Sequence, residues 1–164
     1  MARALIVGCG CRGRELGTAL LDAGWQVRGT TRDPESLGGI EAAGIEPAVG
    51  DPDRPGSILE LISDVTLIYW LLGSVRGGAD AVAALHGARL ERLLEEIVDT
   101  PVRGLVYEAA GTVPRARLRD GVAIVRAAAE RWRIPVAVAE ADPGDVPAWR
   151  AEMLRYATEL TSAG

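Results

Sequence analysis

The feature that most constrains this chain is a group of three glycines, Gly8, Gly10 and Gly13, at the first, third and sixth positions of one short segment. An apolar run, 4–7, precedes it and a helical pattern, 14–21, follows it, which predicts a strand, a glycine turn and a helix. Glycines at this spacing permit a sharp turn, a close approach of the backbone to a pyrophosphate, and tight packing of helix on strand. The pattern therefore predicts a dinucleotide site, although glycine turns also join elements that bind nothing.

Short apolar runs alternate with helical patterns along the rest of the chain. Six strands are expected, over 4–7, 25–30, 45–51, 65–72, 104–108 and 134–139. Helices are expected over 14–21, before a turn at 41–44, and over 54–63, 79–98, 118–132 and 146–160. This alternation predicts an α/β fold, a doubly wound parallel sheet in the order 3-2-1-4-5-6, with a ligand crevice at the carboxyl ends of the first and fourth strands.

Composition limits the classes of protein to which the chain can belong. Its 164 residues, 48% hydrophobic and 25% charged, are enough for a single folded domain, expected over 1–164. A net charge of −5 argues against nucleic-acid and anionic-membrane partners. The longest apolar run, 65–72, is far too short to span a membrane, and the first apolar segment is too short for a secretory signal, so a cytoplasmic location is expected.

All 18 basic residues are arginine, and lysine is absent from the sequence. A lysine Schiff base, a phosphate loop of the GK[ST] type and a catalytic Tyr/Lys pair each need an amine, so all three are excluded.

The end of the second expected strand indicates which dinucleotide would bind. Folds of this type place an acid there for the ribose of NAD, or a basic residue for the phosphate of NADP. Here Thr31 and Arg32 directly follow the expected strand, and Arg12 in the glycine turn can converge on the same ribose. Asp33 follows directly, but its place before Pro34 fits a helix N-cap. NADP is therefore expected in preference to NAD.

Two cysteines and one histidine need a structural or a chemical explanation. Cys9 and Cys11 are too close for an ordinary disulfide, and with His86 they are too few for a zinc site, so no metal is expected. The cysteines fit small residues in a tight turn, and the alternative is a redox-sensitive thiolate stabilised by Arg12 and the helix N-terminus. A packed, neutral imidazole is expected for His86 rather than a catalytic base.

Several segments together resemble the extended and atypical short-chain dehydrogenase/reductases, the superfamily of sugar-nucleotide epimerases and NmrA-like proteins. They are the glycine turn at 8–14, then 29–35, 41–47, 50–51, 105–111 and 134–136. The resemblance implies a Rossmann fold and assigns cofactor binding to Gly8, Gly10, Cys11, Arg12, Gly13, Thr31, Arg32, Asp51, Leu71, Gly73 and Ser74. It also implies a homodimer formed through the helices expected at 79–98 and 118–132.

The chain departs from this family where catalysis normally takes place. The positions of the catalytic serine look like Ala109 and Ala110, the following helix has no tyrosine, and lysine is absent. The C-terminal substrate region of the extended members is not expected in this chain. The remaining catalytic candidates are Glu108 as a general acid or base, Tyr107 and Thr112, and a regular strand would let only one of Tyr107 and Glu108 face the cleft.

Three functions are compatible with these patterns. The first is an NADP(H)-dependent oxidoreductase or epimerase-like enzyme of atypical chemistry acting on a small molecule. The second is a noncatalytic NADP(H)-binding sensor or regulator, which would explain the missing serine, tyrosine and lysine. The third, an accessory subunit that no longer binds a cofactor, is disfavoured because Arg12 and Arg32 are retained.

Overall fold

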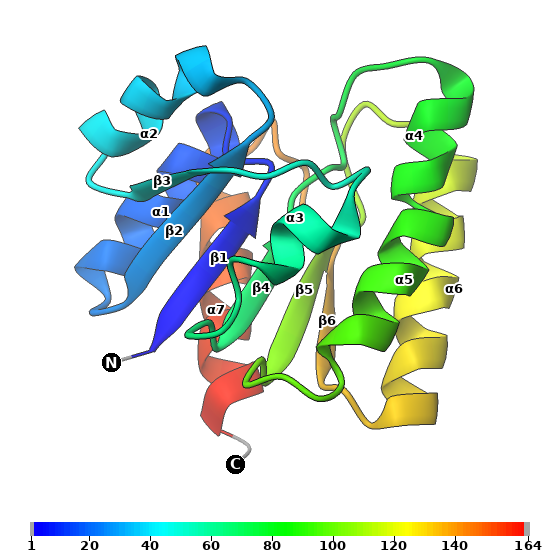
Figure 1. Cartoon of the computed structure of the whole chain (residues 1–164). Helices are drawn as coiled ribbons and strands as arrows, with labels where there is room; N and C mark the ends of the chain where they lie inside the picture. Colours follow the sequence, from blue (N-terminus) through cyan, green and yellow to red (C-terminus); the bar gives the residue numbers. More distant parts are fainter. Residues whose placement is uncertain (1, 163–164) are drawn as a thin grey trace.

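The computed structural model describes residues 2–162 and shows one six-stranded sheet with helices on both faces (Figure 1). The strands are β1 (Arg3–Val7), β2 (Gln26–Thr31), β3 (Glu46–Val49), β4 (Leu67–Trp70), β5 (Gly104–Glu108) and β6 (Val136–Ala139). The helices are α1 (Cys11–Asp22), α2 (Leu37–Ala42), α3 (Pro55–Leu59), α4 (Ala79–Leu85), α5 (Ala88–Ile97), α6 (Arg115–Trp132) and α7 (Val146–Ser162), with a 3-10 turn over Pro34–Ser36.

All strand pairs are parallel, and the order is β3-β2-β1-β4-β5-β6, as predicted. The order reverses between β1 and β4, whose register pairs Ile6 with Tyr69 and Val7 with Trp70. In open sheets of this kind, ligands bind beyond the carboxyl ends of the strands at such a reversal. The glycine turn between β1 and α1 lies at that point.

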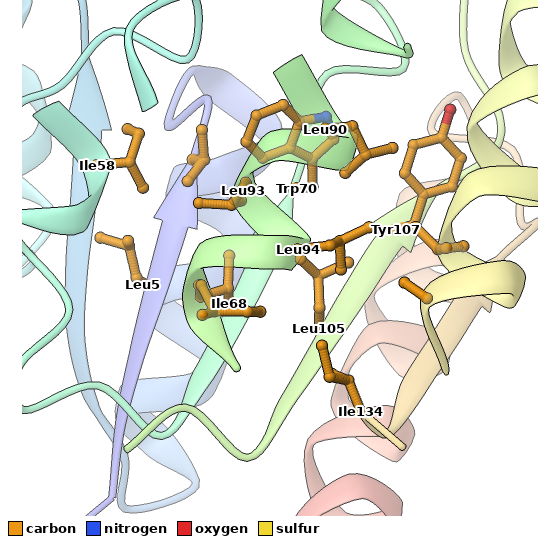
Figure 2. Close-up of a cluster of buried hydrophobic side chains, with 14 of the residues drawn as sticks. Leu5, Ile58, Ile68, Trp70, Leu90, Leu93, Leu94, Leu105, Tyr107 and Ile134 are labelled. Atoms are coloured by element: carbon orange, nitrogen blue, oxygen red, sulfur yellow. The ribbon is translucent and has the colours of Figure 1, made fainter. Parts of the chain in front are cut away.

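Two buried hydrophobic clusters hold the layers together, one on each face of the sheet. Alternate residues of the central strands supply both clusters: Ile68 and Trp70 face α3, α5 and α6, whereas Leu67 and Tyr69 face α1 and α7. Figure 2 shows the first cluster, in which Trp70, Leu90 and Tyr107 lie between the sheet and the helices. Burial on both faces explains why the sequence of β4 is apolar throughout.

The prediction of one helix over 79–98 is wrong, because the structure has two helices with a break at His86 and Gly87. The His86 side chain turns into the core and is fully buried. Gly87 takes a non-helical conformation (φ −135°, ψ −115°), and a Cβ there would lie 2.7 Å from the carbonyl oxygen of Ala83. The predicted helix at 54–63 is also shorter than expected, ending at Leu59. No helix within the described residues is long and apolar enough to cross a membrane.

Candidate functional site: a cavity at the carboxyl edge of the sheet

A cavity of about 530 Å³ lies at the carboxyl edge of the sheet, above the glycine turn. It extends from the ends of β2 and β3 to the ends of β4 and β5. Among the expected cofactor residues, nine line it: Gly8, Gly10, Cys11, Arg12, Gly13, Thr31, Arg32, Leu71 and Ser74. Residues as far apart in sequence as Gly8 and Ser74 therefore contribute to a single concave surface.

The glycine turn is tightly packed on one side and open on the other. Gly8 has a positive φ of +90°, and a Cβ there would lie 2.5 Å from the carbonyl oxygen of Leu71. A Cβ on Gly13 would lie 3.1 Å from the carbonyl oxygen of Gly8, because α1 starts close against β1. A Cβ on Gly10, in contrast, would have no neighbour within 4 Å and would extend into open space. The first and third glycines thus permit the packing, and the second leaves room beside the backbone.

Three arginines surround this part of the cavity. The Nε of Arg12 donates a hydrogen bond to the carbonyl oxygen of Pro143, 2.7 Å away, so a loop distant in sequence positions this side chain. Arg14 donates to the sulfur of Cys11 at 3.4 Å. Arg32 lies 3.7 Å from the Asp53 carboxylate, and both groups are partly exposed, so this ion pair is weak. The guanidinium of Arg32 is therefore available to an anion in the cavity.

Two expected cofactor residues, Asp51 and Gly73, are not among the residues that line the cavity. The Asp51 backbone N–H bonds the Ser57 hydroxyl at 2.9 Å, and its side chain accepts from the Asp53 N–H at 2.9 Å, so it orders the turn before α3. Gly73 is buried, and a Cβ there would collide with the carbonyl oxygen of Ala110.

Further residues line the cavity besides the expected cofactor and catalytic residues. They come from loops and helix starts whose positions depend on the tertiary fold: Cys9, Arg14, Thr30, Ser36, Gly50, Pro52, Leu72, Val75, Arg76 and Pro143. Gly50 and Pro52 flank Asp51 in the sequence, so this segment reaches the cavity on both sides of Asp51.

Glu108 lies at the end of β5 and lines the cavity while remaining 4% exposed. Its carboxylate accepts hydrogen bonds from the Gly73 backbone N–H at 3.0 Å and from the Trp149 indole N–H at 2.9 Å. Burial raises the pKa of Glu108, and this outweighs the opposing effects of the Trp149 and Gly73 hydrogen bonds and of the Arg12 charge. A buried carboxyl with a raised pKa at the edge of a cavity is suited to proton transfer.

Tyr107 points to the opposite face of the sheet, as strand alternation requires, and does not line the cavity. Its hydroxyl lies 2.6 Å from Nδ1 of His86, and Nε2 of His86 lies 2.9 Å from the Leu72 carbonyl oxygen. Because a carbonyl oxygen can only accept a hydrogen bond, Nε2 of the neutral ring carries the hydrogen. Nδ1 then accepts a hydrogen bond from the Tyr107 hydroxyl. Burial lowers the pKa of His86 and raises that of Tyr107. The Tyr107 hydroxyl, a catalytic candidate from the sequence, therefore has no access to the cavity.

Thr112, the third catalytic candidate, is exposed and also lies outside the cavity lining. Its backbone N–H donates to the Ser74 hydroxyl at 3.2 Å, which joins the loops that follow β4 and β5. Of the three catalytic candidates, only Glu108 faces the cavity.

The two cysteines have different surroundings. Cys9 is buried, and burial raises the pKa of its thiol to about 12, a larger effect than the opposing charge of Arg14. The hypothesis of a stabilised thiolate therefore fails for Cys9, which packs in the turn as a small apolar residue. Cys11 is exposed on the first turn of α1.

Within residues 2–162, no group of three or more histidine, cysteine or acidic side chains is arranged to hold a metal ion.

The sequence matches no protein-family model and no curated protein. Solved structures share its fold. They include a UDP-glucuronic acid 4-epimerase from Bacillus cereus in complex with NAD (16% identity, TM-score 0.61, covering 83% of this chain and 55% of that one). They also include a short-chain dehydrogenase/reductase superfamily protein from Agrobacterium tumefaciens with bound NAD (20% identity, TM-score 0.65, covering 83% of this chain and 48% of that one). A third is a short-chain dehydrogenase from Streptomyces avermitilis (19% identity, TM-score 0.63, covering 84% of this chain and 63% of that one).

The chain spans about half to two thirds of the length of these three structures. At such identities the likeness shows the fold alone, which is the Rossmann-type fold of short-chain dehydrogenases and epimerases.

Proposed function

We propose that this chain binds a nicotinamide dinucleotide in the cavity at the carboxyl edge of the sheet, with NADP(H) preferred to NAD(H). The observation that carries the proposal is one cavity that joins the glycine turn to Thr31 and Arg32 at one end and to Glu108 at the other. The open space beside Gly10 fits a pyrophosphate near the N-terminus of α1, where backbone N–H groups lack helical partners. Two of the neighbouring folds are complexes with NAD, which supports this class of ligand.

The preference for NADP(H) rests on this chain's own residues. Arg32 offers a planar set of donors suited to the ribose phosphate, and Thr31 adds a hydroxyl beside it. No acid occupies the last position of β2, where an NAD site would need one. Asp33 is engaged as the N-cap of the following turn, since its carboxylate accepts from the Glu35 N–H at 3.0 Å.

The chemistry proposed is that of an oxidoreductase or epimerase-like enzyme acting on a small molecule. The bound dinucleotide would supply hydride transfer, and the chain's residues would position the reactants. Glu108 is the group that can hold or move a proton there, because its carboxyl is the buried acid that faces the cavity. Gly73 and Trp149 fix its orientation from the two sides.

A noncatalytic sensor is the second candidate, and specific observations favour it. Tyr107 and Thr112 lie outside the cavity, and Ala109 and Ala110 stand where the family has its serine. Both Glu108 oxygens already accept hydrogen bonds, which holds the carboxylate in place. Such a protein would bind NADP(H) without turning it over.

Titration of NADPH and NADH against the purified protein, beside Arg32→Ala, tests the cofactor proposal. NADPH is expected to bind more tightly than NADH, and Arg32→Ala should weaken NADPH by about 10- to 100-fold, the value of one charge-assisted hydrogen bond. NADH affinity should change little. Arg54→Ala is the matched control, because it removes an equal charge from an exposed residue outside the cavity. Equal and negligible binding of both cofactors would refute the proposal.

Turnover separates the enzyme from the sensor. Hydride transfer to a panel of carbonyl and sugar-nucleotide compounds would support the enzyme, provided that Glu108→Gln removes it while NADPH affinity and the melting temperature are retained. Tight NADPH binding with no turnover on any compound would support the sensor. The homodimer expected through α4, α5 and α6 is checked separately, by sedimentation.

A further inference from the structure

A second hollow, of about 610 Å³, lies on the other side of β5 from the Glu108 carboxylate. Its lining comes from α6 and from residues that directly follow β5 and β6. We call it the arginine groove, because Arg115, Arg119 and Arg126 line it. An apolar floor and one acid complete it: Ala109, Leu118, Val122, Ala123 and Glu140.

The three arginines form a stripe along α6. Arg115 and Arg119 are one helical turn apart, and Arg126 follows two turns later, so all three lie along one side of the helix. At 1.5 Å per residue, the stripe is about 16 Å long. Its neighbours on the buried face are Leu118 and Val125, which anchor the helix in the core. The stripe is therefore held on a rigid helix rather than on a loop.

The charge of this stripe is not neutralised by the protein. Some helical arginines are paired with acids, as in Arg92–Glu96 and Arg155–Glu159, whereas others, such as Arg14, are not paired with any acid that the structure describes. Within residues 2–162, Arg115, Arg119 and Arg126 have no carboxylate within 4.0 Å, although the protein as a whole carries a net charge of −5. Three arginines and one glutamate leave the groove lining with a net charge of +2.

The position of Arg115 adds an electrostatic cost. It begins α6, the first turn of this helix holds no acid, and Pro114 provides no side-chain cap. The N-terminus of a helix carries partial positive charge, so an arginine there is repelled. An anion bound at Arg115 and Arg119 would relieve this repulsion.

We propose that the arginine groove binds a phosphorylated small molecule. Guanidinium groups form paired hydrogen bonds with phosphate oxygens, and Arg115 and Arg119 are close enough to share one phosphate. The apolar floor formed by Leu118 and Val122 would contact the unphosphorylated part of the ligand. The site shares no residue with the cavity lined by the glycine turn and stands whether or not that cavity binds a dinucleotide.

Titration of inorganic pyrophosphate against the full chain tests this proposal, with the amide signals of α6 followed by NMR. Wild type is expected to bind at millimolar concentration or below, with shifts in the first turns of α6 and weakening in added salt. Arg115→Ala/Arg119→Ala should weaken binding at least about tenfold, since two charge-assisted interactions are lost. Arg117→Ala/Arg131→Ala is the matched control, because it removes the same charge from α6 outside the groove and should leave the affinity unchanged.

Other outcomes would overturn the proposal. Absence of pyrophosphate binding would do so, as would binding that is lost in Arg12→Ala/Arg32→Ala but not in the groove variant. Equally tight binding of succinate would refute the assignment to phosphate. Sedimentation with phosphatidylglycerol vesicles tests whether the bound phosphate belongs to a lipid headgroup. If the protein stays in solution, a lipid headgroup is excluded. A dimer that dissociates in Arg115→Ala/Arg119→Ala without added phosphate would make the groove an interface between copies. The melting temperatures of all variants show that each one folds.

Discussion

Replacement of Trp149 by alanine is expected to lower the free energy of unfolding by about 3–5 kcal/mol, the usual cost of deleting a buried aromatic side chain. Trp149 is fully buried between α7 and the sheet. Its indole N–H also donates to the Glu108 carboxylate, so the alanine variant leaves a buried acid with one hydrogen bond fewer. Urea unfolding monitored by circular dichroism measures the loss.

Trp149→Phe separates the hydrogen bond from the packing. Most of the ring volume stays, and the loss is expected to be about 1–3 kcal/mol, the cost of an unsatisfied buried polar group. Without this donor, the pKa of Glu108 should rise further above its ordinary value of 4.5. Between the unfolded and folded pKa values the native state binds more protons, so stability falls as the pH rises through that window. In Trp149→Phe, this fall in stability should continue to a higher pH than in wild type.

Trp25→Phe is the matched control for this comparison. Trp25 is half-buried, and within the described residues its indole N–H has no hydrogen-bond partner, so neither the stability nor its pH profile should change much. If Trp149→Phe matched wild type in both properties, Trp149 would not be a significant partner of Glu108.

Gly121→Ala should destabilise the protein by about 3 kcal/mol or more, although alanine normally favours a helix over glycine by about 1 kcal/mol. Gly121 lies in the middle of α6 and is buried against β5. A Cβ there would overlap the hydroxyl and ring carbons of Tyr107, whose ring is itself fully buried. Displacing that ring would also break its 2.6 Å hydrogen bond to His86. Chemical denaturation compares the variant with wild type.

A double-mutant cycle tests the cause. In a Tyr107→Leu background the clash is removed, so Gly121→Ala should cost at least about 1 kcal/mol less than it does in wild type. Gly38→Ala is the matched control, since Gly38 is an exposed helical glycine with no atom within 4 Å of its Cβ position. An equal cost of Gly121→Ala in both backgrounds would contradict contact with Tyr107 as the cause.

The strand order and the place of the crevice could be predicted from sequence because they depend on local patterns. Apolar runs alternating with helical periods specify a doubly wound sheet, and the glycine spacing locates its reversal point. The same reasoning placed Arg12 and Arg32 beside one site, and the structure brings both to one cavity. Asp33 was predicted to cap the following turn, and it does.

The remaining features depend on contacts between distant segments. Trp149 meets Glu108 across 41 positions and Arg12 meets Pro143 across 131, and no local pattern indicates either pair. The break at His86 and Gly87 accompanies a buried hydrogen bond between His86 and Tyr107, 21 positions away, which no local pattern indicates. The resemblance does not indicate that the Asp51 carboxylate accepts a hydrogen bond within its own turn.

Tyr107 and Glu108 adjoin each other in β5 but are held from opposite faces, by His86 on one side and by Trp149 on the other. The amides at this end of β5 are therefore expected to exchange slowly with solvent, because neither face can separate without breaking a buried polar contact. The exposed residues of the loop after Gly73 are held by exposed contacts, such as the hydrogen bond from the Thr112 N–H to the Ser74 hydroxyl, so their amides should exchange faster. Because Trp149 holds Glu108 independently of the loop after β4, the acid is expected to keep its position when a ligand enters the cavity.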